Sequence, residues 1–247
     1  MQGLDSLAVR AAEYRAAGCV FAKWRSPLTI DGASGKPSEL AIEANCRDLA
    51  RYALICQSVG LVPLVEPDVV LTGTHTLEVA VEVNARVHAA LFKAMADYGV
   101  YMEGALFKVN MVNPGNSCPV PYSVDAIAAA NLGVLRRSLP VAIRSVNFLS
   151  GGQSLDDCAA RLNTMNTLKQ QRGVCSAPWN LSFSWSACIQ LPLFQLCKTE
   201  DFSADEAGMP TQAMQELYLK NLKIASDAAL GKLTLAPGAG DHTPPVE

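Results

Sequence analysis

Short runs of apolar residues recur along the chain at a nearly regular interval. Five of them end in a charged or small residue, and their centres are separated by roughly 35 to 42 residues, the spacing of strand and helix units. Continuous apolar runs of this length are typical of strands buried on both faces. The pattern predicts five buried strands: GCVFAKWR (18–25), GLVPLVEP (60–67), YMEGALFK (101–108), IRSVNFLSGG (143–152) and PWNLSFSW (178–185).

The segments between these strands have apolar residues at helical spacing. The clearest case is the series Val79, Val83, Val87, Leu91 and Met95, and weaker series run through 49–56 and 127–135. Serines mark three expected helix starts, and glycines mark three expected ends before a strand. These are Ser38, Ser123 and Ser154, and Gly18, Gly60 and Gly99.

Alternating strands and helices indicate an α/β protein with a parallel sheet. Two architectures are common, an open doubly wound sheet and a (β/α)₈ barrel. No G-x-G-x-x-G follows a predicted strand, which disfavours a dinucleotide-binding sheet. Pro63 removes a ladder donor, so it fits a strand only near its start or at a bulge. We expect one domain over 1–230 and a mobile, solvent-exposed tail over 231–247.

Composition narrows the class of protein. The chain has 247 residues, is 50% hydrophobic and carries a net charge of -3 with no basic cluster, which favours a globular protein that binds no nucleic acid. Neither a signal peptide nor a membrane-spanning segment is recognisable, so the expected compartment is the cytoplasm. The eight cysteines contain no C-x-x-C pair and are expected to be reduced thiols.

Charged residues gather at the carboxyl ends of the predicted strands. They are Lys23, Arg25, Glu66, Asp68 and Lys108. Any one of them alone fits a structural ion pair. Because the carboxyl ends of parallel strands meet at one edge, the five side chains are expected to lie together, where α/β enzymes place their active sites.

This cluster fits the chemistry of a lysine nucleophile. Such a lysine needs a lowered pKa, which burial and a neighbouring cation both provide, and Lys108 with Lys23 nearby meets that need. Glu66 is a candidate acid and base for the proton transfers of Schiff-base formation. Ser150, Gly151 and Gly152 precede an expected helix start and are a candidate phosphate loop, although such a run alone is more often a plain turn.

The motifs FAKWR (21–25), LVEPDV (64–69), EGALFKVNMVNPG (103–115) and FLSGGQS (148–154) resemble class I fructose-bisphosphate aldolase. The resemblance runs in order from about Leu4 to about Lys220. It implies a TIM (β/α)₈ barrel of which this chain covers strands 4 to 8. It also implies cleavage of fructose 1,6-bisphosphate to dihydroxyacetone phosphate and glyceraldehyde 3-phosphate, a glycolytic lyase reaction that uses no metal or cofactor.

Residue by residue, the resemblance implies a role for each candidate. Lys108 matches the Schiff-base lysine, Glu66 the proton-transfer carboxylate, and Lys23 the neighbouring cation. Asp68 stands where the family usually has glutamate, which keeps the charge. The list of implied substrate-phosphate ligands comprises Arg25, Ser150, Gly151 and Gly152.

Three departures from the family pattern bear on activity. Ala187 occupies the position of a phosphate-binding arginine, so a charged hydrogen-bond partner is lost. The family's first three strands, with an aspartate and a lysine of the site, have no counterpart, and five strands cannot close an eight-stranded barrel. The family's C-terminal tyrosine is also missing, since the chain ends in Val246 and Glu247.

These departures leave alternatives open. The first is an aldolase that is truncated or impaired, and that forms a homo-oligomer, a tetramer in the family, where the full barrel is present. The second is a noncatalytic aldolase-like binding or regulatory protein. A zinc enzyme is a poor third, because His75, His88 and His242 are the only histidines and lack ligand spacing.

Overall fold

Five parallel strands form one sheet in which the strands follow chain order, β1-β2-β3-β4-β5. The computed structural model describes residues 2–170, 177–199 and 212–245, so Cys175, Val246 and Glu247 lie outside the described residues. All five predicted strands are confirmed, with shifted ends. Their bounds are β1 (Phe21–Leu28), β2 (Val62–Val69), β3 (Leu106–Val109), β4 (Ser145–Phe148) and β5 (Asn180–Phe183).

Helices alternate with the strands, as the hydrophobic pattern predicts. They are α1 (Leu7–Ala16), α2 (Glu39–Ser58), α3 (Leu77–Asp97), the 3-10 helix η1 (Met102–Gly104), α4 (Val124–Ser138), α5 (Leu155–Gln170), α6 (Ala187–Thr199) and α7 (Gln212–Ala229). The pattern does not locate α6 or α7. Within the described ranges, no helix is both long enough and apolar enough to cross a membrane.

The predicted helix starts are confirmed by their hydrogen bonds. The hydroxyls of Ser38 and Ser123 accept from the backbone N–H groups of Ala41 and Ala126, each at 3.2 Å. Ser154 caps α5 in the same way, at 3.0 Å from the N–H of Asp157. A capping hydroxyl of this kind typically stabilises a helix by about 1 kcal/mol. The serines therefore set where the loop after each strand stops and the helix begins.

Pro63 is accommodated as the sequence requires. It is the second residue of β2, where it pairs with Ala22 of β1. A proline near a strand's start removes few ladder hydrogen bonds. The apolar run that contains it therefore still forms a strand.

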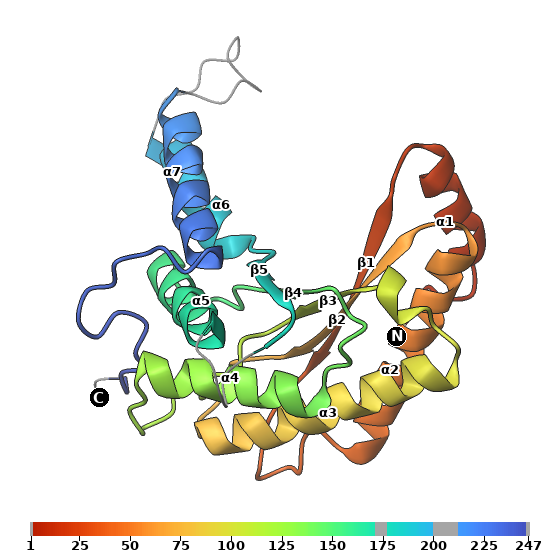
Figure 1. The fold of residues 1–247 in the computed structure, drawn as a ribbon, viewed down its shortest axis with the longest axis horizontal. Helices are drawn as coiled ribbons and strands as arrows, with labels where there is room; N and C mark the ends of the chain where they lie inside the picture. The colour runs from red at the N-terminus through yellow and green to blue at the C-terminus, as the bar shows by residue number, and fades with distance from the viewer. Residues whose placement is uncertain (1, 171–176, 200–211, 246–247) are drawn as a thin grey trace.

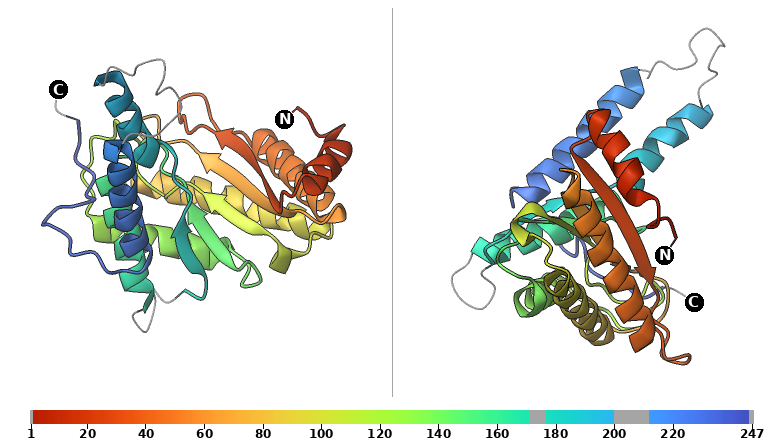
Figure 2. Two further views of the ribbon diagram at one scale, coloured as in Figure 1. Left: turned by 90° about the horizontal axis from the view of Figure 1, so that it is seen from above. Right: turned by 90° about the vertical axis from the view of Figure 1, so that its right-hand side faces the viewer.

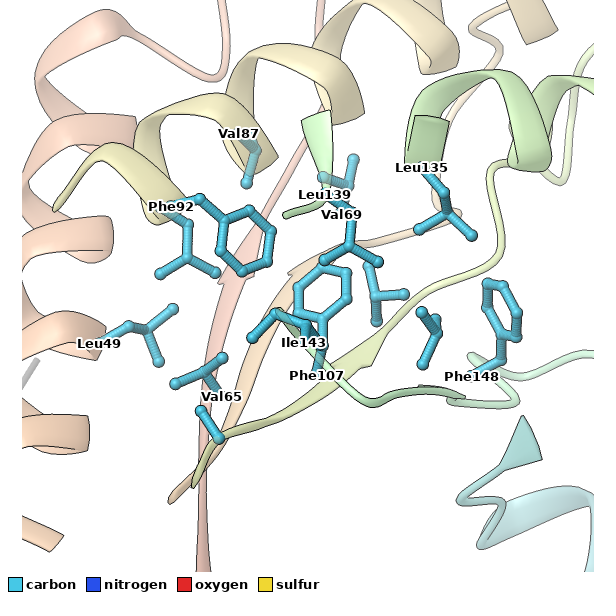
Figure 3. Close-up of a cluster of buried hydrophobic side chains, with 14 of the residues drawn as sticks. Leu49, Val65, Val69, Val87, Phe92, Phe107, Leu135, Leu139, Ile143 and Phe148 are labelled. Atoms are coloured by element: carbon cyan, nitrogen blue, oxygen red, sulfur yellow. The ribbon is translucent and has the colours of Figure 1, made fainter. Parts of the chain in front are cut away.

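The strands bury one set of alternating side chains against the helices. Figure 1 shows α2, α3 and α4 lying side by side along one side of the sheet. Figure 3 shows Val65, Phe107 and Phe148 of the sheet pointing toward apolar residues of these helices, among them Leu49 and Val87. Phe107 is 0% exposed, and truncating such a side chain typically costs 3 to 5 kcal/mol.

The sheet is an incomplete barrel. Among the described residues β1 pairs with β2 alone and β5 with β4 alone, so the two outer strands do not meet. In Figure 2 the sheet is curved and open, with α1 at one end and α6 and α7 at the other. The predicted fold class, a barrel segment of five strand and helix units, matches this arrangement.

The tail predicted to be mobile and exposed is held against the domain over its described part. Arg161 of α5 donates from Nε to the carbonyl of Gly240 at 2.8 Å, and the N–H of Val124 donates to Asp241 Oδ1 at 2.7 Å. Further along the tail, His242 exchanges backbone hydrogen bonds with Tyr122. The expectation of a mobile tail did not include these polar contacts, which link residues 79 to 120 positions apart. The domain boundary at residue 230 stays a prediction.

Candidate active site

The alternation of the strands decides which side chains share the open face of the sheet. Trp24 pairs with Val65, and Val65 pairs with Phe107, and these side chains pack into the core. Neighbouring residues in a strand point to opposite faces. The charged residues next to this apolar row therefore lie on the other face. They are Lys23 and Arg25 of β1, Glu66 and Asp68 of β2, and Lys108 of β3.

Glu66 lies between two lysines. Its Oε2 is 3.0 Å from Lys23 Nζ, and its Oε1 is 3.6 Å from Lys108 Nζ. The Glu66 side chain is 4% exposed and that of Lys108 is 12% exposed, whereas Lys23 reaches solvent at 42%. The structure thus brings together the three residues that the sequence analysis assigned to the chemical step.

The environment of Lys108 favours the neutral amine more than water does. Burial lowers the pKa of Lys108 below its usual value, and the positive charge of Lys23 lowers it further. The Glu66 carboxylate acts in the opposite direction, and the net pKa shift is downward. A lysine in this state is a better nucleophile, because the neutral amine carries the free electron pair.

Arg25 and Asp68 form a second charged pair beside the first. Arg25 reaches Asp68 Oδ2 from Nε at 2.8 Å and from a terminal nitrogen at 2.6 Å. Burial raises the pKa of the Asp68 carboxyl, and the hydrogen bond and charge of Arg25 hold that rise in check. Asp68 positions the guanidinium on the open face, with about half of the Arg25 side chain left exposed.

The loop of Ser150, Gly151 and Gly152, named the Ser150 loop, follows β4. Ser150 is 4% exposed, while Gly151 and Gly152 are exposed and have φ angles of +59° and +87°. Side chains rarely adopt such φ angles, so glycine is required for this path into α5. The loop leads directly to the capped amino end of α5, where the helix dipole favours an anion.

A cavity of about 740 Å³ connects this loop with the Arg25 and Asp68 pair. Its lining includes Gly151, Gly152 and Arg161, while Lys23, Glu66 and Lys108 lie outside that lining. The volume falls in the range of small-molecule sites, about 300 to 1,000 Å³. The cavity therefore joins Arg25 to Gly151 and Gly152. Lys23, Glu66 and Lys108 lie on the open face of the sheet, outside the cavity lining.

Comparison with known proteins identifies the family. The sequence model of the family described as "Glycolytic: Fructose-bisphosphate aldolase class-I" matches residues 1–243. The chain belongs to the class I fructose-bisphosphate aldolase family. The family resemblance stated from the motifs is thereby confirmed.

Individual relatives in the aldolase family match over most of this chain. Fructose-bisphosphate aldolase of Dictyostelium discoideum is 43% identical over 94% of the chain and 62% of its own length. Fructose-bisphosphate aldolase C of Rattus norvegicus is 42% identical over 97% of the chain and 61% of its own length. The chain thus spans about three fifths of the length of these relatives.

A solved aldolase structure has the same fold. Fructose-bisphosphate aldolase from Plasmodium falciparum, crystallised with TRAP and a small molecule inhibitor, superposes with a TM-score of 0.85 at 38% identity. The match covers 95% of this chain and 64% of that one. The incomplete barrel is accordingly the same arrangement of strands and helices as the corresponding part of a family member.

The sequence analysis missed a hydrogen-bond chain behind the Ser150 loop. Gln153 donates from Nε2 to the Ser150 carbonyl at 2.8 Å, and its Oε1 accepts from Asn113 at 3.1 Å. Arg161, 6% exposed, donates to the same Oε1 at 2.5 Å. The FLSGGQS motif contains Gln153, but no local pattern pairs it with an arginine two helical turns further on. These side chains hold the loop in place.

Ala187 is the first residue of α6 and is partly exposed. Its methyl group offers no hydrogen bond, so the position contributes no cation to the site. Hydrogen bonds with Cys158 and with Ser150 lower the pKa of the next residue, Cys188. Position 187 is therefore one residue from a direct contact of the Ser150 loop.

The three histidines are dispersed. His88 lies in α3, is 1% exposed and packs edge-on against Phe107 with ring centroids 5.1 Å apart. His242 lies in the tail near Cys118, with Nε2 3.0 Å from that residue's carbonyl oxygen. Within the described residues, no three His, Cys, Asp or Glu side chains gather as metal ligands.

Proposed function

We propose that the chain carries the chemistry of a class I fructose-bisphosphate aldolase, the reversible cleavage of fructose 1,6-bisphosphate to dihydroxyacetone phosphate and glyceraldehyde 3-phosphate in glycolysis. The supporting observation is the placement of Glu66 between Lys23 and Lys108, together with the lowered pKa of Lys108. Family membership supports the same reaction. The whole enzyme's activity is a proposal here, because the chain spans about three fifths of its relatives.

Lys108 is the proposed nucleophile. Its neutral amine adds to the ketone carbon of the sugar phosphate, and the nitrogen proton moves to the carbonyl oxygen to give a carbinolamine. Loss of water then leaves an iminium ion. As the Glu66 carboxylate takes the proton of the C4 hydroxyl, the C3–C4 bond breaks, its electron pair moves into the iminium as an enamine, and the aldehyde is released. Burial of Lys108 supports the first step.

Glu66 is the proposed acid and base of the dehydration step. The Glu66 carboxylate takes the proton that Lys108 loses on becoming neutral and gives it to the departing hydroxyl, so that water leaves, and hydrolysis reverses the transfer. The 3.6 Å separation between Glu66 Oε1 and Lys108 Nζ supports this role, because it places the carboxylate close to the nitrogen on which the carbinolamine forms. Lys23 keeps the pKa of Lys108 low, and Asp68 positions Arg25.

The phosphate groups are proposed to bind at Arg25 and at the Ser150 loop with Gly151 and Gly152. Oriented N–H groups and the amino end of α5 supply the attraction for an anion. Ala187 removes a guanidinium that the family pattern places next to this loop. Loss of a charged hydrogen bond costs about 1.5 to 3 kcal/mol, so the affinity for a bisphosphate should be lower than for a chain with arginine there.

The experiment that tests this proposal is mass spectrometry of the purified chain after borohydride reduction with dihydroxyacetone phosphate. The expected adduct is a reduced Schiff base on Lys108. Lys108→Met is the negative control, and Lys93→Met, an exposed lysine of α3, is the matched positive control. Absence of the adduct from folded protein, shown by circular dichroism, contradicts the proposed reaction.

A second function is favoured by two observations, the alanine at position 187 and the outer strands β1 and β5, each of which pairs with one strand among the described residues. In that case the chain is a noncatalytic aldolase-like protein that binds a complete aldolase. A pulldown that yields a stable complex with a complete aldolase, in the absence of borohydride trapping, supports it. Trapping by the isolated chain contradicts it.

The setting of the proposed enzyme follows from the same reasoning. We propose a cytoplasmic protein that acts on sugar phosphates and binds neither nucleic acid nor membranes, consistent with its net charge of -3. A homo-oligomer is proposed where the barrel is complete. Size-exclusion chromatography with light scattering measures this directly.

A further inference from the structure

A buried arginine lines the cavity beside the Ser150 loop. Arg161 of α5 is 6% exposed, and its guanidinium donates only to neutral oxygens among the described residues. Nε donates to the Gly240 carbonyl at 2.8 Å, Nη1 to Gln153 Oε1 at 2.5 Å, and Nη2 to the Asp241 carbonyl at 3.3 Å. Buried charges in proteins are normally paired. The cavity therefore contains a positive charge that is not neutralised by contact with a described carboxylate.

Cations that line another hollow of the surface are paired. Arg47 and Lys93 line a groove of about 420 Å³ between α2 and α3. Arg47 lies 2.7 Å from the Glu43 carboxylate, and Lys93 lies 2.5 Å from the Asp97 carboxylate. That groove therefore has no unpaired cation to offer an anion, in contrast to the cavity at the Ser150 loop.

Two carboxylates act on Arg161 without pairing with it. Burial lowers the pKa of Arg161, and the charges of Asp157 and Asp241 act in the opposite direction. Asp157 Oδ2 accepts from the Ser154 hydroxyl at 2.8 Å. Asp241 Oδ1 accepts from the N–H of Val124 at 2.7 Å. Both carboxylates are partly exposed, so solvent screens them, whereas the guanidinium stays charged and buried.

Several N–H groups that line the cavity are free to donate. A guanidinium has five N–H groups, and the described residues accept from Nε and from one hydrogen of each terminal nitrogen of Arg161. The backbone N–H groups of Gly151 and Gly152 donate to no carbonyl in the described part of the chain. All three residues line the cavity. Free donors around a buried positive charge suit the oxygens of an anion.

The same cavity has an acceptor without a donor. Asn113 is 3% exposed and lines the cavity, and its Nδ2 donates to Gln153 Oε1 at 3.1 Å. Its Oδ1 has no hydrogen-bond partner among the described residues. Buried polar atoms are normally hydrogen-bonded. A fully ionised phosphate cannot donate to this oxygen, so a ligand that satisfies it needs a hydroxyl group as well.

We propose that Arg161, together with Gly151 and Gly152, binds a phosphate monoester in this cavity. A hydroxyl group of the same ligand donates to Asn113 Oδ1. The volume of about 740 Å³ is that of a small-molecule site, and a planar guanidinium suits phosphate oxygens. Arg161 then supplies from α5 the guanidinium that Ala187 does not supply from α6. Identity of this ligand with an aldolase substrate rests on the proposed function, whereas binding in the cavity does not.

The test is isothermal titration of the whole chain with two probes, inorganic phosphate and glycerol 3-phosphate. Arg161→Gln should weaken the binding of both by about 10-fold or more, the effect of losing a charged hydrogen bond. Arg137→Gln removes an exposed arginine of α4 and should leave both affinities unchanged. The proposal is overturned if Arg161→Gln binds as tightly as the unsubstituted chain, or if the unsubstituted chain binds neither probe.

The hydroxyl contact is tested by the ratio of the two affinities. Glycerol 3-phosphate carries hydroxyl groups and should bind about two- to tenfold more tightly than inorganic phosphate, the effect of one hydrogen bond. Asn113→Leu removes the acceptor and should bring this ratio close to one. An unchanged ratio in Asn113→Leu contradicts the role of Asn113.

Release of the tail would be a structural explanation for a loss of binding in Arg161→Gln, because Arg161 also holds the carbonyls of Gly240 and Asp241. Gly240→Ala displaces the tail by overpacking and keeps the guanidinium, and amide exchange at His242 reports that displacement. Phosphate binding in Gly240→Ala should stay near that of the unsubstituted chain. A loss as large as that of Arg161→Gln assigns the effect to the tail and overturns the proposal.

Borohydride trapping separates this site from the proposed function. If phosphate binding depends on Arg161 but Lys108 gives no adduct with dihydroxyacetone phosphate, the proposed reaction fails and the cavity site stands. If the adduct forms but phosphate binding does not depend on Arg161, the cavity site fails and the proposed reaction stands.

Discussion

Lys108 Nζ lies 3.6 Å from Glu66 Oε1, and both side chains are almost fully shielded from water. Burial lowers the pKa of the lysine, whereas the carboxylate raises it. The charge of Lys108 is therefore a balance of two opposing effects. Changes to the neighbours of Lys108 should shift that balance in directions that can be stated in advance.

Among the neighbours of Lys108, Glu66 is the residue proposed to transfer a proton. Glu66→Gln removes that ability. The pKa of Lys108 should fall further, because the carboxylate that raises it is gone. The rate of borohydride trapping with dihydroxyacetone phosphate should nevertheless fall by about 10² or more, because the iminium forms only after an acid-assisted loss of water. The exposed Glu43, paired with Arg47, provides the control Glu43→Gln. Equal trapping rates in the two variants would rule out an acid–base role.

Lys23→Met tests the second influence on the same lysine. The positive charge of Lys23 lowers the pKa of Lys108, so its removal should raise that pKa. Trapping should then require a higher pH, and its pH profile should move toward alkaline values. Lys23→Arg keeps the charge and should keep the profile near that of the unsubstituted chain. A shift of the pH profile toward acidic values would mean that another charged group controls the pKa of Lys108.

The sequence predicts that Lys23, Glu66 and Lys108 lie together, as the structure has them, because strand periodicity is a local property. Once the strands at 18–25, 60–67 and 101–108 are recognised, their carboxyl ends place Lys23, Glu66 and Lys108 near one another. The support of the Ser150 loop is not local. It depends on side chains of α5, α6 and the tail, and the packing between those helices is set by the whole fold.

Ala187→Arg should strengthen phosphate binding. The substitution places a guanidinium one residue from Cys188, which contacts Ser150. A charged hydrogen bond contributes about 1.5 to 3 kcal/mol, which corresponds to a gain of about 10-fold or more in affinity for dihydroxyacetone phosphate. Isothermal titration measures this. Ala187→Gln, which lacks the charge, is the control, and an equal gain with glutamine would show that charge is not the missing element.

His88 should make the protein sensitive to acid. Burial lowers the pKa of His88 to about 3, whereas an unfolded histidine titrates near 6.5. As the pH falls below about 6.5, the unfolded chain binds a proton that the folded chain does not accept. The stability present above pH 6.5 is therefore lost progressively between about pH 6.5 and pH 3, by about 1 kcal/mol per pH unit.

His88→Leu should reduce this dependence. Leucine fits beside Phe107, and Ser138 retains its hydrogen bond to the Val134 carbonyl at 2.8 Å, so the change leaves no hydroxyl without a partner. Urea unfolding at pH 7 and pH 5 should show a smaller loss of the free energy of unfolding in the variant. An identical loss in both proteins would assign the acid sensitivity to other groups.

Gly240 decides whether the tail can remain against α4 and α5. An added Cβ would lie 2.7 Å from Ala160 Cβ and 2.9 Å from Val124 Cγ2, at a φ of +81°. Gly238 has a similar φ of +75°, but its nearest contact would be the Asp241 carboxylate at 3.6 Å. The two alanine variants therefore share the backbone cost, about 1 kcal/mol, and differ in the clash.

Gly240→Ala should lower the free energy of unfolding by about 1 to 3 kcal/mol more than Gly238→Ala, because overpacking adds to the backbone cost. It should also accelerate amide exchange at His242, whose N–H donates to the Tyr122 carbonyl at 2.8 Å. The carbonyl of Gly240 accepts from the buried Arg161, so displacement of the tail leaves this guanidinium without one partner. Equal losses of the free energy of unfolding in the two variants would mean that the loss comes from backbone strain and not from a clash with α4 and α5.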